Sequence, residues 1–104
     1  MSESKRNFDT LLIQSIEDGL VKVLGDESAK CVTFYIDPHI AATNPDNYAK
    51  SILKLFGVGS KVMFDAILDD LNEKTGTTRS EATSFGGAVT DARRSFQQRD
   101  KIKA

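Results

Sequence analysis

Residues 44–76 read NPDNYAKSILKLFGVGSKVMFDAILDDLNEKTG, and this stretch carries the clearest pattern in the chain. Asn44 and Pro45 form a helix-entry signal, because Asn accepts backbone N–H bonds at a helix cap and Pro suits the first helical position. Apolar residues then recur at helical spacing in two groups, Tyr48, Ile52, Leu55 and Phe56 before the glycines and Phe64, Ile67, Leu68 and Leu71 after them. The stretch predicts a helical hairpin over residues 45–75.

The hinge of this predicted hairpin is the segment 56–60, which contains Gly57 and Gly59. Gly57 supplies the left-handed backbone that commonly ends a helix, and Ser60 can cap the helix that follows. So short a connection places the two helices antiparallel and side by side, with both apolar stripes facing a third layer.

Length and composition limit the function classes. The chain has 104 residues, 39% of them hydrophobic and 28% charged, which is ordinary for one globular domain. A net charge of −1 gives no overall attraction to nucleic acid or anionic membrane. The single cysteine, Cys31, excludes an internal disulfide and a Cys-cluster metal site. We find no signal-peptide pattern and no apolar run of membrane length, so we expect a cytoplasmic protein without a membrane partner.

A first helix is predicted between residue 7 and Gly25. Asn7 or Asp9 can cap it, and Gly25 ends it. Its apolar positions recur at helical spacing, at Leu12, Ile13, Ile16, Leu20, Val23 and Leu24. Gly19 interrupts the pattern at a cost of roughly 1 kcal/mol against Ala. Either another helix passes close to Gly19, or the site merely tolerates glycine.

The segment 28–36 is ambiguous between helix and strand. Its residues 31–36, CVTFYI, have a composition that favours a strand. However, we find no partner strand in the rest of the sequence, and a lone strand cannot satisfy its backbone. Ala29, Val32 and Ile36 also share one helical face, so we predict a helix that ends before Pro38.

The charge changes sign after Gly76. Residues 1–76 carry a net charge of −4 and residues 77–104 a net charge of +3. We therefore divide the chain into a helical domain at 1–76 and a polar linker with a basic amphipathic helix at 77–104. The apolar stripe of this last helix consists of Phe85, Val89, Ala92 and Phe96, and its basic residues are Arg93, Arg94, Arg99, Lys101 and Lys103.

Two roles for this basic helix stay open. Phe85, Val89 and Phe96 need burial, which favours docking on the acidic body or on a second copy of the chain. The alternative is that the Arg and Lys side chains contact nucleic-acid phosphates. We prefer docking, in cis or in trans, because the basic excess is small and has little aromatic interleaving.

Catalytic signals are weak throughout the chain. His39 and Asp37 lie close together on a connector, but one His and one carboxylate make neither a catalytic triad nor a four-ligand zinc site. A nucleophilic cysteine needs a nearby base, and the sequence offers Cys31 only His39. We therefore interpret Cys31 as a small buried core residue. We expect no catalytic residue, no metal and no cofactor.

The glycine hinge and two acidic pairs each suggest an ion-binding site, but each also has a simpler structural interpretation. The hinge and Lys61 resemble a phosphate loop superficially, but the full motif spacing and a preceding strand are absent. The acidic pairs 17–18 and 69–70 can in principle hold Mg²⁺, yet adjacent residues on a helix do not face each other. A helix connector and solvated helix surface explain these features without a ligand.

Three segments together resemble a known family. LLIQSIEDGL at 11–20, KCVTFYI at 30–36 and LKLFGVGSK at 53–61 are similar to a family of small archaeal helical domains, described as signalling output domains of ammonia-oxidising archaea. The resemblance covers roughly residues 9–75 and implies a helix at 28–36. It carries no catalytic residues, and the extension 77–104 lies outside it.

The sequence thus predicts an all-α protein of four helices and a basic fifth helix. We expect a non-catalytic regulatory or signalling protein that acts through protein–protein interaction, with a homodimer interface that includes the stripe from Phe85 to Phe96. The interaction residues expected are Phe85, Val89, Arg93, Arg94, Phe96, Arg99 and Lys101. Nucleic-acid binding by the basic helix is the second hypothesis. A small enzyme or anion sensor that uses the hinge glycines with Lys61 or His39 is the third.

Overall fold

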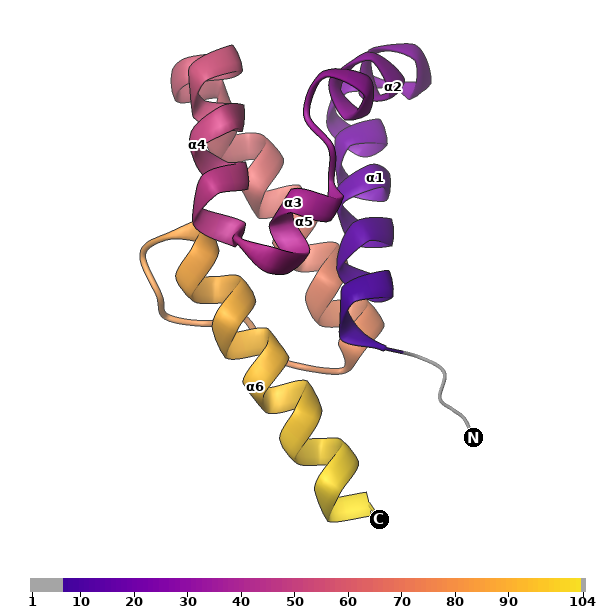
Figure 1. The fold of residues 1–104 in the computed structure, drawn as a ribbon, viewed down its shortest axis with the longest axis vertical. Coiled ribbons are helices and arrows are strands. Elements are labelled where there is room, and N and C mark those ends of the chain that lie inside the picture. Colours follow the sequence, from indigo (N-terminus) through magenta and orange to yellow (C-terminus); the bar gives the residue numbers. More distant parts are fainter. Residues whose placement is uncertain (1–6, 104) are drawn as a thin grey trace.

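The computed structural model describes residues 7–103, with side chains described for residues 7–98. This part of the chain is all-α and contains no strand (Figure 1), as the sequence predicts. The elements are α1 (Phe8–Leu24), α2 (Asp26–Tyr35), α3 (His39–Thr43), α4 (Pro45–Phe56), the 3₁₀ turn η1 (Gly57–Gly59), α5 (Ser60–Thr75) and α6 (Phe85–Lys103).

Two predicted caps are confirmed. The Asn7 side chain accepts the backbone N–H of Thr10 at 3.0 Å and so caps α1. The Asn44 side chain accepts the N–H of Asn47 at 3.1 Å and caps α4. Each cap satisfies a backbone donor that the first helical turn leaves unpaired.

The segment with strand-like composition is the helix α2. Ala29, Val32 and Ile36 are buried, and α2 packs on α1. The single apolar face therefore decides in favour of a helix, because burial of that face outweighs the local β-propensity.

A close helix crossing explains Gly19. The helices α1 and α5 form the most extensive helix pair of the fold. A Cβ atom on Gly19 would lie 2.7 Å from Ile67 Cγ1 and 2.8 Å from Ile67 Cα. Because backbone atoms of α5 occupy this space, only glycine permits the observed approach.

The predicted hairpin of α4 and α5 is present and antiparallel (Figure 1), but its two helices make few direct contacts with each other. Phe85, in the first turn of α6, lies between them. Its ring centroid is 6.2 Å from that of Tyr48 on α4 and 5.0 Å from that of Phe64 on α5. Both helices of the hairpin therefore pack on α6, while the stripe of α5 also packs on α1, where Ile67 lies against Gly19.

The basic helix belongs to the same core as the rest of the chain. Phe85, Ala88, Val89 and Ala92 of α6 join the buried apolar cluster of α1 to α5. Residues 1–76 and 77–104 thus share one hydrophobic core, and the stripe of α6 is docked in cis.

The connecting segment 77–84 is held at both ends. Asn72 Nδ2 on α5 donates a hydrogen bond of 2.7 Å to Thr77 Oγ1. Ser80 Oγ donates one of 2.5 Å to Asp91 Oδ2 on α6. The linker is therefore tied to the helix before it and to the helix after it.

Two hydroxyl groups lie unpaired inside the core. Ser15 Oγ and the Tyr48 hydroxyl are buried and have no hydrogen-bond partner. Burial raises the pKa of Tyr48, because removal from water disfavours the phenolate. Each unpaired hydroxyl costs about 1–3 kcal/mol of stability.

Candidate functional site

The stripe expected to contact a partner is internal. Phe85 is 5% exposed and Val89 is fully buried, while Phe96 packs against Phe8 with ring centroids 6.0 Å apart. Phe85 and Val89 are thus core residues rather than interaction residues, and a homodimer through this stripe would require α6 to leave its seat. The reason is physical: the hairpin of the same chain already offers the apolar surface that the stripe needs.

Of the two basic residues of α6 with described side chains, Arg93 serves the fold. Arg93 Nη2 lies 2.8 Å from Asp9 Oδ1 and donates a 3.0 Å hydrogen bond to the carbonyl of Ala42. Its guanidinium carbon stands 4.7 Å from the centre of the Phe8 ring. Arg94 is exposed. Three further basic residues lie beyond the described side chains, namely Arg99, Lys101 and Lys103. Arg93 is therefore not free to bind a nucleic-acid phosphate, as the nucleic-acid hypothesis requires.

The hinge is a structural connector. Gly57 has φ 60°, a backbone that favours glycine, whereas Gly59 has φ −67° and open space around its Cα. Ser60 does not cap α5: its hydroxyl donates a 2.7 Å hydrogen bond to the carbonyl of Gly57. The predicted cap is wrong because Ser60 sits inside the first turn of α5, and its buried hydroxyl bonds to a carbonyl of η1 instead.

Asp37 and His39 form an isolated exposed pair. Asp37 Oδ1 accepts the backbone N–H of His39 at 3.0 Å and lies 2.8 Å from His39 Nδ1. The backbone hydrogen bond, supported by the imidazole, lowers the pKa of Asp37. By accepting the backbone N–H two residues further on, the Asp37 side chain forms an Asx turn at the start of α3. Among the described residues, no group of three or more His, Cys, Asp or Glu side chains that could hold a metal ion includes this pair.

Cations pair with three of the four acidic residues that were considered as magnesium ligands, namely Asp18, Asp69 and Asp70. Lys74 Nζ lies 2.9 Å from Asp18 Oδ2 and 2.7 Å from Asp70 Oδ2. The hydrogen bond to Asp70 raises the pKa of Lys74. Arg79 Nη1 lies 2.6 Å from Asp69 Oδ1. Within the described residues, no group of three or more His, Cys, Asp or Glu side chains is placed to hold a metal ion.

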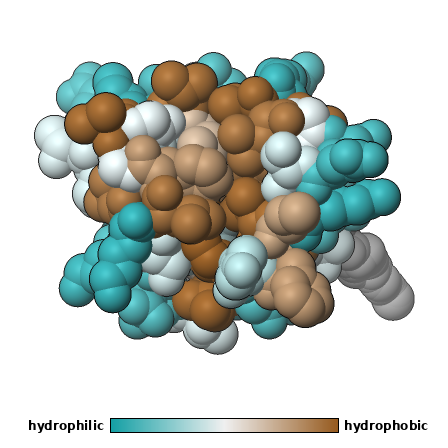
Figure 2. Space-filling model, turned by 90° about the horizontal axis from the view of Figure 1, so that it is seen from above, coloured by the Kyte–Doolittle hydropathy of each residue, from teal (hydrophilic) through white to brown (hydrophobic). Residues whose placement is uncertain are grey.

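A different surface gathers the exposed apolar side chains. At one end of the molecule, α2, the last turn of α4, η1 and the first turn of α5 meet, and Figure 2 shows apolar residues concentrated there. We call this surface the apolar end. Its large apolar side chains are between 48% and 99% exposed and comprise Phe34, Tyr35, Leu53, Leu55, Val58 and Val62. Large apolar side chains that gather exposed at one end of a molecule are typical of an interaction surface.

Two shallow hollows lie between α2 and the end of α4. Both are bordered by Tyr35 and Leu55. The larger has a volume of about 350 Å³ and is otherwise lined by Leu24, Ser28, Cys31, Val32 and Phe56. The smaller, of about 250 Å³, is otherwise lined by Ile36, Ser51 and Lys54. The apolar end is therefore not flat, because aromatic side chains project from it beside two apolar hollows.

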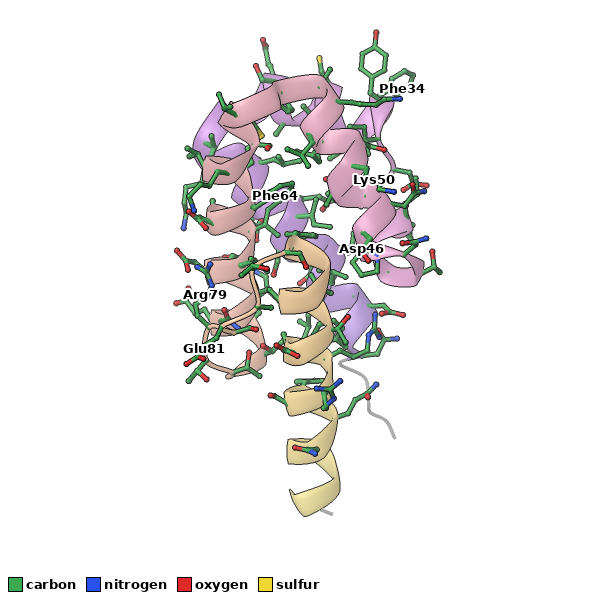
Figure 3. All side chains as sticks on the ribbon, turned by 90° about the vertical axis from the view of Figure 1, so that its left-hand side faces the viewer. Phe34, Asp46, Lys50, Phe64, Arg79 and Glu81 are labelled. Atoms are coloured by element: carbon green, nitrogen blue, oxygen red, sulfur yellow. The ribbon has the colours of Figure 1, made fainter. Side chains whose placement is uncertain are left out.

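Phe34 and Tyr35 are the most prominent groups of this surface. They are 88% and 80% exposed, and their rings meet edge to face with centroids 6.5 Å apart. Figure 3 shows Phe34 at this end of the molecule, whereas Arg79 and Glu81 lie toward the other. An edge-to-face contact of this kind is favourable by about 0.5–1.5 kcal/mol.

Opposite charges flank the apolar end. The segment 26–37, which contains α2, has three acidic residues and one lysine. The segment 50–61, from the second half of α4 to the start of α5, has three lysines and no acidic residue. The α2 segment is thus net negative and the α4 segment net positive, and Lys54 of the latter lines the smaller hollow.

The sequence held a signal for this surface that its interpretation missed. Once Ala29, Val32 and Ile36 fill the buried face of α2, Phe34 and Tyr35 are left off that face. Cys31 is left off it too and is exposed, so the reading of Cys31 as core filler is wrong. Two aromatic residues outside the stripe of a helix are the pattern that points to an exposed contact.

Comparison with known proteins gives no relative: no family model, no curated protein and no solved structure matches the chain. Among residues 7–103, no helix is both long and apolar enough to cross a membrane. The geometry of the apolar end therefore carries the functional conclusion.

Proposed function

We propose that this protein is a non-catalytic regulatory or signalling module that binds another protein through the apolar end. The observation that carries the proposal is the exposure of Phe34 and Tyr35, at 88% and 80%, beside apolar hollows. Interface cores are enriched in aromatic residues, and a few such residues provide most of the binding energy.

The remaining chemistry of the described residues supports a binding role. The candidate reactive groups are isolated or paired with other side chains: Asp37 with His39, and Lys74 with two carboxylates. Neither of the two hollows contains a His or an acidic lining residue. The similarity of residues 9–75 to small signalling output domains agrees with a module that transmits a signal by contact.

The proposal can be tested by affinity capture with the full-length chain. We expect the immobilised wild type to retain a protein from a native cell extract, and we expect the double variant Phe34→Ser, Tyr35→Ser to retain at least tenfold less. With the purified partner, titration calorimetry should show a tenfold or greater rise in Kd. Both side chains point into solvent, so their loss should leave the fold intact.

The matched control is Val21→Ser, which removes another exposed apolar side chain, on α1 and outside the apolar end. It should bind as the wild type does. Equal capture by the double variant and the control would contradict the proposed function.

A further inference from the structure

Resting on the proposed function, we propose that the protein bound at the apolar end is a second copy of this chain, related to the first by a two-fold axis. Closed dimers with a self-complementary interface are the commonest assemblies of soluble proteins. Three properties of the surface favour this occupant: its area, its relief and its charge.

The exposed area matches one side of a dimer interface. The two aromatic side chains, 88% and 80% exposed, present roughly 300 Å² between them. The four aliphatic side chains of the apolar end add about 200 Å² at the area that corresponds to their partial burial. A standard interface buries about 800 Å² on each partner, of which somewhat more than half is apolar. The exposed apolar area of the apolar end is about as large as the apolar part of such an interface. A short peptide would leave much of this area uncovered.

The relief of the surface is self-complementary. Phe34 and Tyr35 project, and the larger hollow of about 350 Å³ lies on the neighbouring side of α2, facing Leu55 and Phe56. A two-fold axis through this surface brings the projecting pair of each copy toward the hollow of the other. Both contacts then form at once, as an isologous interface requires.

The charge pattern selects the same arrangement. A two-fold axis sets α2 of one copy against α4 of the other. The net negative segment 26–37 of each copy is then brought toward the net positive segment 50–61 of the other, in both halves of the interface. Dimerisation also leaves α6 unobstructed, because α6 ends at the opposite side of the molecule (Figure 1).

Sedimentation equilibrium of the full chain tests the proposal. Between about 1 μM and 1 mM, a range that spans weak to moderate affinities, the mass of the wild type should rise from 11.4 kDa to twice that value. The double variant Phe34→Ser, Tyr35→Ser should remain at 11.4 kDa. Lys54→Glu should weaken the dimer tenfold or more, and Val21→Ser should leave it unchanged.

Cys31 provides a second measurement that does not depend on mass. It is exposed in one copy and lines the larger hollow. A maleimide should label it quickly in dilute wild type and at least tenfold more slowly in concentrated wild type. In the double variant the labelling rate should not depend on concentration.

The outcomes separate this inference from the proposed function. A wild type of 11.4 kDa at every concentration overturns the second-copy proposal. If that monomer captures a different protein, and the double variant does not, the proposed function still stands. A dimer that the double variant leaves intact also overturns the second-copy proposal, because its interface lies elsewhere.

Discussion

Two groups of aromatic side chains lie in different regions of this molecule. In the core, Phe85 is 5% exposed and its ring lies between those of Tyr48 and Phe64. At the apolar end, Phe34 is 88% exposed and its ring meets only that of Tyr35. The first group joins three helices in one core, whereas the second consists of two neighbouring residues of α2. An aromatic pair that is largely exposed to solvent is best explained by contact with another molecule.

The sharpest test of this contrast compares Phe85→Ala with Phe34→Ala. Phe85→Ala should lower the free energy of unfolding by about 3–5 kcal/mol, because it leaves a cavity between α4, α5 and α6. Phe34→Ala should change it by less than about 0.5 kcal/mol in dilute protein. Urea unfolding followed by circular dichroism measures both, and similar losses would remove the distinction.

Two glycines extend the comparison to the backbone. Gly19→Ala should cost about 1–3 kcal/mol, since the new methyl group would meet Ile67 of α5 at 2.7–2.9 Å. Gly59→Ala, beside the apolar end, meets nothing within 4 Å and has an ordinary helical φ of −67°. It should be neutral or add up to about 1 kcal/mol. Thermal unfolding of the two variants decides whether α1 and α5 require this close approach.

Arg93 and Lys54 allow the same comparison between the core and the apolar end, now for positively charged side chains. Arg93→Ala should lower stability by about 1–2 kcal/mol, because Arg93 joins α6 to Asp9, to the carbonyl of Ala42 and to the ring of Phe8. Lys54→Ala, on the rim of the apolar end, should change stability by less than about 0.5 kcal/mol. A loss for Lys54→Ala as large as that for Arg93→Ala would show that the rim also supports the monomer.

The smallest expected effect is a gain. Tyr48→Phe removes a buried hydroxyl that has no partner, so it should raise the free energy of unfolding by about 1 kcal/mol. Tyr35→Phe removes an exposed hydroxyl and should be neutral within about 0.5 kcal/mol. Urea unfolding at neutral pH compares the two, and a loss in Tyr48→Phe would mean that the hydroxyl is paired.

The Tyr48→Phe variant also makes a prediction for alkaline pH. Tyr48 has a raised pKa in the folded state, and a tyrosine in the unfolded chain titrates near about pH 10. The unfolded state therefore loses this proton first, and stability should fall as the pH rises above about 10. Tyr48→Phe should reduce that fall relative to the wild type. Unfolding midpoints between neutral pH and pH 11 measure the difference.

Local rules predicted the helices of this fold well, except for the short α3 at His39–Thr43, where a connector was expected. Caps at Asn7 and Asn44 depend on residues a few positions apart, so the sequence contains all the information that they need. The helix at 26–35 was harder, because its composition favours a strand. It was found by asking which backbone could both bury Ala29 and Val32 and satisfy its own hydrogen bonds.

The site was harder to predict than the fold. Periodicity assigned Phe85 and Val89 to an apolar stripe correctly, but a stripe does not reveal whether the same chain or another covers it. The answer depended on the gap between α4 and α5, which arises only in three dimensions. Phe34 and Tyr35 were missed because a search for periodic burial gives no weight to residues off the buried face. The exposure of Cys31 has the same cause.

The anchored segment 77–84 affects how copies of this chain can associate. Exchange of a terminal helix between protomers begins when a connecting loop straightens and releases that helix. Here Thr77 is bonded to α5 and Ser80 to α6, so the loop must break both ties before it can straighten. The short tether also keeps α6 at a high local concentration near its seat, which favours return over exchange. The protein is thus protected against domain swapping.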